Sequence, residues 1–177
     1  DGKDYSADHI IIATGARSRE LPNLPQDDDK VIGYRKAMTL KKQPKKIVIV
    51  GSGAIGVEFA YFYNSMGTEV TVVEYMPRIV PVEDEDVSKQ LERSFKKSGI
   101  KVLTSTEVTS VDTSGDGVKA MIKTKKGEDV LQADMVLSAV GIKTNIENIG
   151  LEDVGIVTDR DKILVNDYYQ TNIPGYY

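Results

Sequence analysis

The apolar residues of the chain alternate between short uninterrupted runs and segments with helical spacing. Residues 47–50 are a β-branched run without polar alternation, as expected for a strand that is buried on both faces of a sheet. Residues 70–73 are predicted to form the next strand. The apolar residues between these runs recur at helical spacing and are followed by Gly67, which is typical of an amphipathic helix with a glycine cap. They are Ile55, Phe59, Phe62, Tyr63 and Met66.

A second helix and a third strand are predicted next. The acidic residues 84–86 place negative charge at the start of this helix, where the helix dipole favours it. Gly99 ends the helix, and residues 100–103 form the strand. The apolar stripe of the helix is expected to consist of Val87, Leu91 and Phe95.

After the third strand, the alternation of strands and helices gives way to short strands separated by turns. Short strand candidates at 107–111, 118–124 and 129–132 are separated by glycine-containing turns, which predicts an antiparallel meander. Residues 135–140 return to an apolar strand that stops at Gly141. The pattern therefore predicts an α/β fold, a Rossmann-like βαβαβ parallel sheet with an inserted three-stranded antiparallel meander. Before it, residues 7–14 are predicted to form a further buried strand.

Composition excludes several classes of protein. A net charge of −4 and a pI near 5.1 argue against a partner that is nucleic acid or an anionic membrane. The chain has no cysteine, so it contains no disulfide, zinc-thiolate site or thiol nucleophile. No apolar stretch approaches the roughly 20 residues that span a bilayer. The chain opens with Asp1 rather than Met, which indicates a piece of a longer protein, for which we expect a cytoplasmic location.

A glycine-rich turn lies between the first strand and the helix and matches G-x-G-x-x-G. Gly51 permits a tight turn, Gly53 has no Cβ to obstruct a pyrophosphate, and Gly56 lets the helix pack close to the strand. The helix N-terminus offers unpaired N–H groups and partial positive charge to a diphosphate. A plain strand–turn–helix is the alternative. The motif consists of Gly51, Ser52, Gly53, Ala54, Ile55 and Gly56.

Glu74 ends the second strand, 18 residues past Gly56, close to the spacing of a dinucleotide-binding acid. Its carboxylate can accept hydrogen bonds from the adenosine ribose of NAD. The 2′-phosphate of NADP would face like charge there, at roughly 1–4 kcal/mol for contact near 4 Å. Arg78 is the one nearby cation, and Pro77 precedes it. The sequence therefore favours NAD over NADP; an ordinary solvated carboxylate is the alternative.

Glu58 lies on what is predicted to be the first turn of the same helix. A carboxylate there would tend to repel a pyrophosphate. It either reaches toward the nicotinamide end or a cation on another domain, or simply complements the helix dipole. The residues alone leave these two roles open.

Five stretches, in order and spread over nearly the whole chain, resemble the dihydrolipoamide dehydrogenases of the pyridine nucleotide–disulfide oxidoreductase family. One departure is Lys143-Thr144, where that family commonly has Arg-Pro. The stretches are residues 11–16, 51–59, 73–81, 139–141 and 170–175.

The resemblance implies the roles of individual residues. Glu58 would approach a lysine beside a flavin, Glu74 would bind the adenosine ribose, Val108 would contact the adenine through its backbone, and Gly141 would contact the nicotinamide half. No residue is assigned as a nucleophile, general base or metal ligand. The NAD pyrophosphate and nicotinamide would be lined by Gly51, Ser52, Gly53, Ala54, Ile55, Gly56, Val57 and Glu58. FAD would be touched, in the intact parent, by Thr14, Gly15 and Ala16.

The resemblance also implies a division of the chain. Residues 1–35 would be an FAD-domain remnant and linker, 36–144 the NAD-binding domain, and 145–177 a segment that returns to the FAD domain, with 170–175 as a strand. The parent would be a homodimer in which NAD accepts a hydride from reduced FAD. Its substrate would be a dithiol, such as the dihydrolipoyl groups of a 2-oxo acid dehydrogenase complex.

The chain by itself is expected to be inactive. The N-terminal FAD fingerprint, the redox cysteine pair and the His-Glu acid/base pair of that family are absent from it. The alternatives are the same domain of a mercuric reductase, an NADH oxidase or a glutathione reductase-like enzyme, and a non-enzymatic NAD-binding module. Glu74 disfavours the NADPH users among these.

Overall fold

The computed structural model describes residues 2–177, which form two compact units. One unit is Ser18–Gly141. The other is formed by the two ends of the chain, up to Arg17 and from Ile142 onward.

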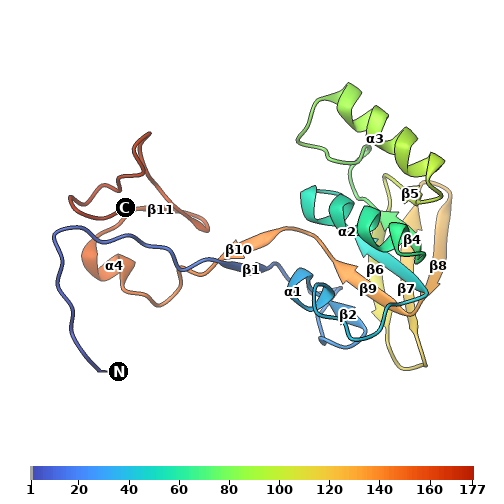
Figure 1. Ribbon diagram of the computed structural model, residues 1–177, viewed down its shortest axis with the longest axis horizontal. Helices are drawn as coiled ribbons and strands as arrows, with labels where there is room; N and C mark the ends of the chain where they lie inside the picture. The colour runs from blue at the N-terminus through green and yellow to red at the C-terminus, as the bar shows by residue number, and fades with distance from the viewer. Residues whose placement is uncertain (1) are drawn as a thin grey trace. The chain divides into compact units, whose positions relative to one another are not determined.

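A five-stranded parallel sheet is the centre of the larger unit (Figure 1). The register aligns Ile47 with Val70 on one side and Ile49 with Leu137 on the other. The strand of residues 135–138, the last of this sheet along the chain, therefore inserts beside the strand of residues 46–50, and the α/β fold is confirmed. The order across the sheet is β2 (Val31–Ile32), β9 (Met135–Ser138), β3 (Lys46–Val50), β4 (Glu69–Val73) and β5 (Lys101–Leu103).

Strand β2 was not predicted. It pairs with β9 through Val31 and Ile32, both buried, and Asp27 fixes the turn before it by accepting the backbone N–H groups of Asp29, Lys30 and Val31 at 2.8–2.9 Å. Residues 18–33 consequently pack with the sheet, and the two compact units divide after residues 17 and 141.

Helices α2 (Ala54–Ser65) and α3 (Glu85–Lys97) cover one face of the sheet. Alternate side chains of the strands, such as Ile47 and Val72, pack there against Ala60, Tyr63 and Phe95. The short helix α1 (Tyr34–Ala37) joins this layer, because the Tyr63 hydroxyl donates to the Ala37 carbonyl at 2.8 Å.

The ends of α3 form as predicted, whereas its predicted stripe is partly wrong. Asp84 caps the helix by accepting the N–H of Asp86 at 2.8 Å, and Gly99 has a left-handed φ of 86°. Phe95 is buried, but Val87 is 53% exposed and Ser88 takes the inner position. The loop before α3 sets this rotation, since the Ser88 hydroxyl donates to the carbonyl of Ile79.

The antiparallel meander covers the opposite face of the sheet (Figure 1). Its side chains Val108 and Ile122 pack against Val48, Val50 and Val73. The sheet is therefore buried on both faces, which explains why its strands carry no polar alternation. The strands of the meander are β6 (Glu107–Asp112), β7 (Val118–Thr124) and β8 (Gly127–Ala133).

The smaller unit has little regular structure, and the buried strand predicted at 7–14 is wrong. The N–H groups of Ile10 and Ile12 do bond to the carbonyls of Gly175 and Tyr177 at 2.8 and 2.7 Å, but only on one edge, and Ile11 is 77% exposed. Residues 170–175 form turns rather than a strand. The elements here are β1 (Ala16–Ser18), which pairs with β10 (Ile142–Thr144), then α4 (Leu151–Val154), β11 (Thr158–Asp159) and β12 (Lys162–Ile163).

No helix within residues 2–177 is both long and apolar enough to cross a membrane.

The smaller unit contains an ion-pair cluster around Glu147. Its carboxylate meets the Arg17 guanidinium at 2.7 Å and the Lys143 ammonium at 2.7 Å. Hydrogen bonds from Arg17, then from Lys143, lower the pKa of Glu147 from 4.5 to about 2. Because the pKa is depressed in the folded state, the stabilisation is complete above pH 4.5 and is lost as the pH falls toward 2.

We expect Glu147→Gln to remove most of this acid sensitivity. The protection of the Asn145 amide, which donates to the Gly15 carbonyl at 2.9 Å, should fall on acidification in the wild type and change little in the variant. Amide hydrogen exchange measured between pH 6 and about 2 tests this, with the exposed Glu152→Gln as control. Parallel pH profiles for wild type and Glu147→Gln would refute the assignment.

Candidate functional site

The glycine-rich loop lies at the carboxyl ends of the central strands. It connects β3 to α2, and the Gly51 N–H donates to the Val73 carbonyl at 2.9 Å. On the other side, the Ala139 N–H donates to the Val50 carbonyl at 2.8 Å. The loop is thus held between the ends of β4 and β9, the edge at which open α/β sheets bind ligands.

Two of the three glycines are required by the packing of the chain itself. Gly51 has a φ of 98°, and a Cβ there would overlap the carbonyl of Ala139. A Cβ on Gly56 would overlap the carbonyl oxygen of Gly51, so this glycine permits the close approach of helix and strand. Both glycines would be needed with or without a ligand.

The packing of the chain does not require a glycine at position 53. Its φ of −67° and ψ of −175° suit any residue, and a Cβ built on it meets no atom within 4 Å. It is the N-cap of α2 and provides no side-chain cap, so the first N–H groups of the helix have no partner within it. The missing side chain keeps open the space in front of donors that suit an anion.

Glu74 is buried beside this loop, with 7% of its surface exposed. One carboxylate oxygen, Oε2, accepts the Ser52 backbone N–H at 2.8 Å and the Ser52 hydroxyl at 2.6 Å. The other, Oε1, accepts the Met76 N–H at 2.8 Å. The alternative of an ordinary solvated carboxylate is therefore wrong. The contact with Ser52 was not predicted, since no local pattern indicates it.

The connection between β5 and β6 lies against Glu74. The Glu74 N–H donates to the Leu103 carbonyl at 2.8 Å, and the Thr106 N–H donates to the Glu74 carbonyl at 2.9 Å. Two residues further on, Val108 is buried in β6, and its carbonyl accepts a hydrogen bond from the Asn23 side chain.

No ion pair to Glu74 forms among residues 2–177. Arg78, the nearest cation along the sequence, donates to the carbonyls of Pro81 at 3.1 Å and Glu83 at 3.4 Å. Arg78 is thus bonded to backbone carbonyls and does not pair with the Glu74 carboxylate.

Glu58 lies beyond the first helical turn, so its predicted place on that turn is wrong. Because α2 begins at Ala54, Glu58 is its fifth residue, and the first turn contains no acidic side chain. Its side chain is exposed. The effect of the helix dipole is confined to the first turn, so the simple dipole role is disfavoured.

The remaining predicted residues lie in different places. Gly141 follows β9 with a φ of 110°, and its carbonyl accepts the Arg19 N–H at 3.0 Å. Thr14 and Gly15 belong to the smaller unit, where their carbonyls accept from Asn145 at 3.1 and 2.9 Å, and Ala16 follows them in β1. The candidates for NAD thus lie in the larger unit and those for FAD in the smaller one.

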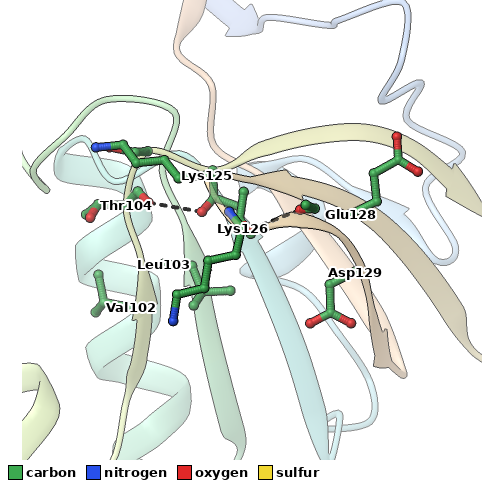
Figure 2. Close-up of a pocket in the computed structure, with 11 residues that line it drawn as sticks. Val102, Leu103, Thr104, Lys125, Lys126, Glu128 and Asp129 are labelled. Atoms are coloured by element: carbon green, nitrogen blue, oxygen red, sulfur yellow. Dashed lines mark hydrogen bonds between the residues drawn. The ribbon is translucent and has the colours of Figure 1, made fainter.

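A depression of about 580 Å³ lies between the end of β5 and the turn that joins β7 to β8 (Figure 2). Lys125, Lys126, Glu128 and Asp129 line its turn side and are exposed. Its two positive and two negative charges balance, so it favours no charged ligand. Residues 2–177 also contain no cluster of three or more histidine or acidic residues that would hold a metal ion.

Comparisons with known proteins agree with this arrangement. A dihydrolipoyl dehydrogenase from Rhizobium etli is 45% identical over 98% of this chain and 36% of that protein. A leghemoglobin reductase from Glycine max is 41% identical over 96% of this chain and 33% of its own length. The solved structure of LpdA from Mycobacterium tuberculosis superposes with a TM-score of 0.86 at 32% identity, covering 97% of this chain and 37% of that one.

The chain spans about a third of the length of the curated relatives that it resembles. The sequence pattern of the family described as pyridine nucleotide-disulphide oxidoreductase matches residues 1–177. A parallel sheet with a glycine loop at its carboxyl edge and a buried acid beside it accompanies that match. The chain belongs to the pyridine nucleotide-disulphide oxidoreductase family.

Proposed function

We propose that this chain is the NAD(H)-binding domain of a flavin-dependent dihydrolipoyl dehydrogenase. The observation that carries the proposal is Gly53, whose lack of a side chain serves nothing inside the chain and leaves open the space before the N-terminus of α2. When bound, NAD supplies a ring that accepts a hydride, and FAD in the longer protein supplies that hydride. The residues of this chain bind and orient the dinucleotide.

The diphosphate is held by the N–H groups at the start of α2. Gly53, Ala54 and Ile55 are the first residues of that helix end, where N–H groups lack carbonyl partners and the helix dipole is positive. The fold keeps this loop in place through Gly51 and Gly56 even without the cofactor, so little ordering is needed on binding.

Glu74 selects the unphosphorylated ribose. Its Oε1 accepts one hydrogen bond, from Met76, and an ionised carboxylate oxygen can accept about one more. A ribose hydroxyl of NAD fills that position. The 2′-phosphate of NADP would bring negative charge against a buried carboxylate that forms no ion pair within residues 2–177, and burial raises this repulsion above its value in water.

The roles of the remaining residues are those that the resemblance to the family implies. Val108 contacts the adenine, Gly141 contacts the nicotinamide half, and the exposed Glu58 pairs with a lysine of the FAD domain. Thr14, Gly15 and Ala16 contact FAD. Relatives named dihydrolipoyl dehydrogenase support this assignment.

The substrate of the longer protein is a dithiol such as a dihydrolipoyl group, and the protein is a homodimer. Because this chain has no cysteine, the thiol exchange takes place on residues of the longer protein outside it. The chain by itself binds the dinucleotide but does not oxidise the dithiol.

Gly53→Ala is expected to weaken NADH binding by about 10-fold or more, because the added methyl group occupies the space of the diphosphate. The thermal unfolding midpoint should not fall, since nothing in the chain lies within 4 Å of the new Cβ. Titration by nicotinamide fluorescence measures the affinity. Gly115→Ala, which also places a Cβ in open space, is the matched control and should bind as the wild type does. Unchanged affinity in Gly53→Ala would remove the main support for the proposal.

Glu74→Ala should weaken NADH binding by about 10- to 100-fold, the range expected for a lost hydrogen bond to a charged group. NADPH binding should change much less, because the repulsion disappears together with the carboxylate. Titrations with both cofactors give the ratio of the two affinities. Glu69→Ala, an exposed acid at the other end of β4, should leave that ratio unchanged. If Glu74→Ala also leaves it unchanged, Glu74 does not bind the ribose.

A further inference from the structure

We infer that Ser52 determines the preference for NAD over NADP by holding the Glu74 carboxylate in place, an inference that rests on the proposed function. Ser52 is 0% exposed and lies between Gly51 and Gly53. Its side chain is therefore closed off from solvent, and within residues 2–177 its one side-chain hydrogen bond goes to Glu74.

The hydrogen bonds around Ser52 fix it from several sides. Its N–H and its hydroxyl both donate to Oε2 of Glu74, at 2.8 and 2.6 Å. Its carbonyl accepts the Val80 N–H at 3.0 Å, so the segment after Glu74 folds back onto the loop. A short hydroxyl-to-carboxylate bond of this kind belongs to the stronger class of hydrogen bonds.

This arrangement orients the two carboxylate oxygens differently. Oε2 is occupied by Ser52, whereas Oε1 has a single donor, Met76. The carboxylate cannot exchange the two oxygens without breaking the bonds to Ser52. Oε1 therefore keeps a free acceptor position on the side that the ribose approaches, and a 2′-phosphate meets a carboxylate that cannot turn away.

Ser52 also couples the two parts of the site. It is the second residue of the loop that holds the diphosphate, and its partner selects the ribose, although the two residues are 22 positions apart in the sequence. Binding of the diphosphate and recognition of the sugar consequently depend on one buried contact.

The test is Ser52→Ala in the full chain, with Thr68→Val as the matched control. Thr68 is a buried residue whose hydroxyl donates to the Pro44 carbonyl at 2.8 Å, just before β4. Its loss removes an equally buried hydroxyl at the opposite end of the strand that Glu74 follows. We expect Ser52→Ala to raise the Kd for NADH about 10-fold and the Kd for NADPH less than about 2-fold. Thr68→Val should change neither.

The same change in a Glu74→Gln background separates positioning from general stability. If Ser52 acts through the charge of Glu74, then Ser52→Ala has little further effect on NADH affinity once that charge is gone. An equal loss of affinity for both cofactors, or a full-sized effect in the Glu74→Gln background, would overturn the inference and leave the proposed function standing. A wild-type chain that does not bind NADH would overturn both.

Amide hydrogen exchange without cofactor provides a second readout. The Met76 N–H reports the position of Glu74 because it donates to Oε1. We expect its exchange to accelerate about 10-fold in Ser52→Ala and to stay unchanged in Thr68→Val. In the reciprocal variant Glu74→Gln, the Ser52 amide should exchange faster. Unchanged exchange at Met76 in Ser52→Ala contradicts the inference even if that variant binds NADH weakly.

Discussion

The site depends on the buried carboxylate of Glu74, whose hydrogen-bond donors are supplied by the chain itself. Burial of an ionised group is costly unless hydrogen bonds replace its hydration. Ser52 and Met76 provide those bonds to Glu74, so the charge is compensated before any ligand arrives. The same bonds tie the glycine loop to the end of β4. The loop is therefore held in part by Glu74, the residue that we propose contacts the sugar.

The sheet around this contact could be predicted to the extent that its strands are buried on both faces. The runs at 47–50 and 70–73 contain enough apolar residues to identify strands without a partner. Val31 and Ile32 could not be identified in this way, because two residues carry no periodicity and their position depends on β9. Residues 7–14 have the composition of a buried strand. A strand is buried only where other elements pack on both of its faces. Within residues 2–177, residues 7–14 pair along one edge with residues 175–177.

The motif of the site could be predicted, but not the separate tasks of its glycines. All three glycines fit a single pattern in the sequence. In the structure, a side chain at Gly51 or Gly56 would overlap the backbone, whereas a side chain at Gly53 would meet no other residue. Ser52 occupies a variable position of the motif, so local spacing gives it no role. Its role arises from a contact with a residue on another strand, and a single sequence contains no signal for such a pairing.

In the proposed function, the glycine-rich loop binds the diphosphate and Glu74 distinguishes NAD from NADP. A diphosphate is common to both dinucleotides, so the helix N-terminus supplies affinity without discrimination. Discrimination requires a charge that stays where the extra phosphate would arrive, and an exposed glutamate with free rotamers would move aside at little cost. Burial beside the loop removes that freedom, and the donors of Ser52 make the burial possible. Under the proposed function, the selecting residue and the phosphate-binding loop are therefore linked through the hydrogen bonds between Ser52 and Glu74.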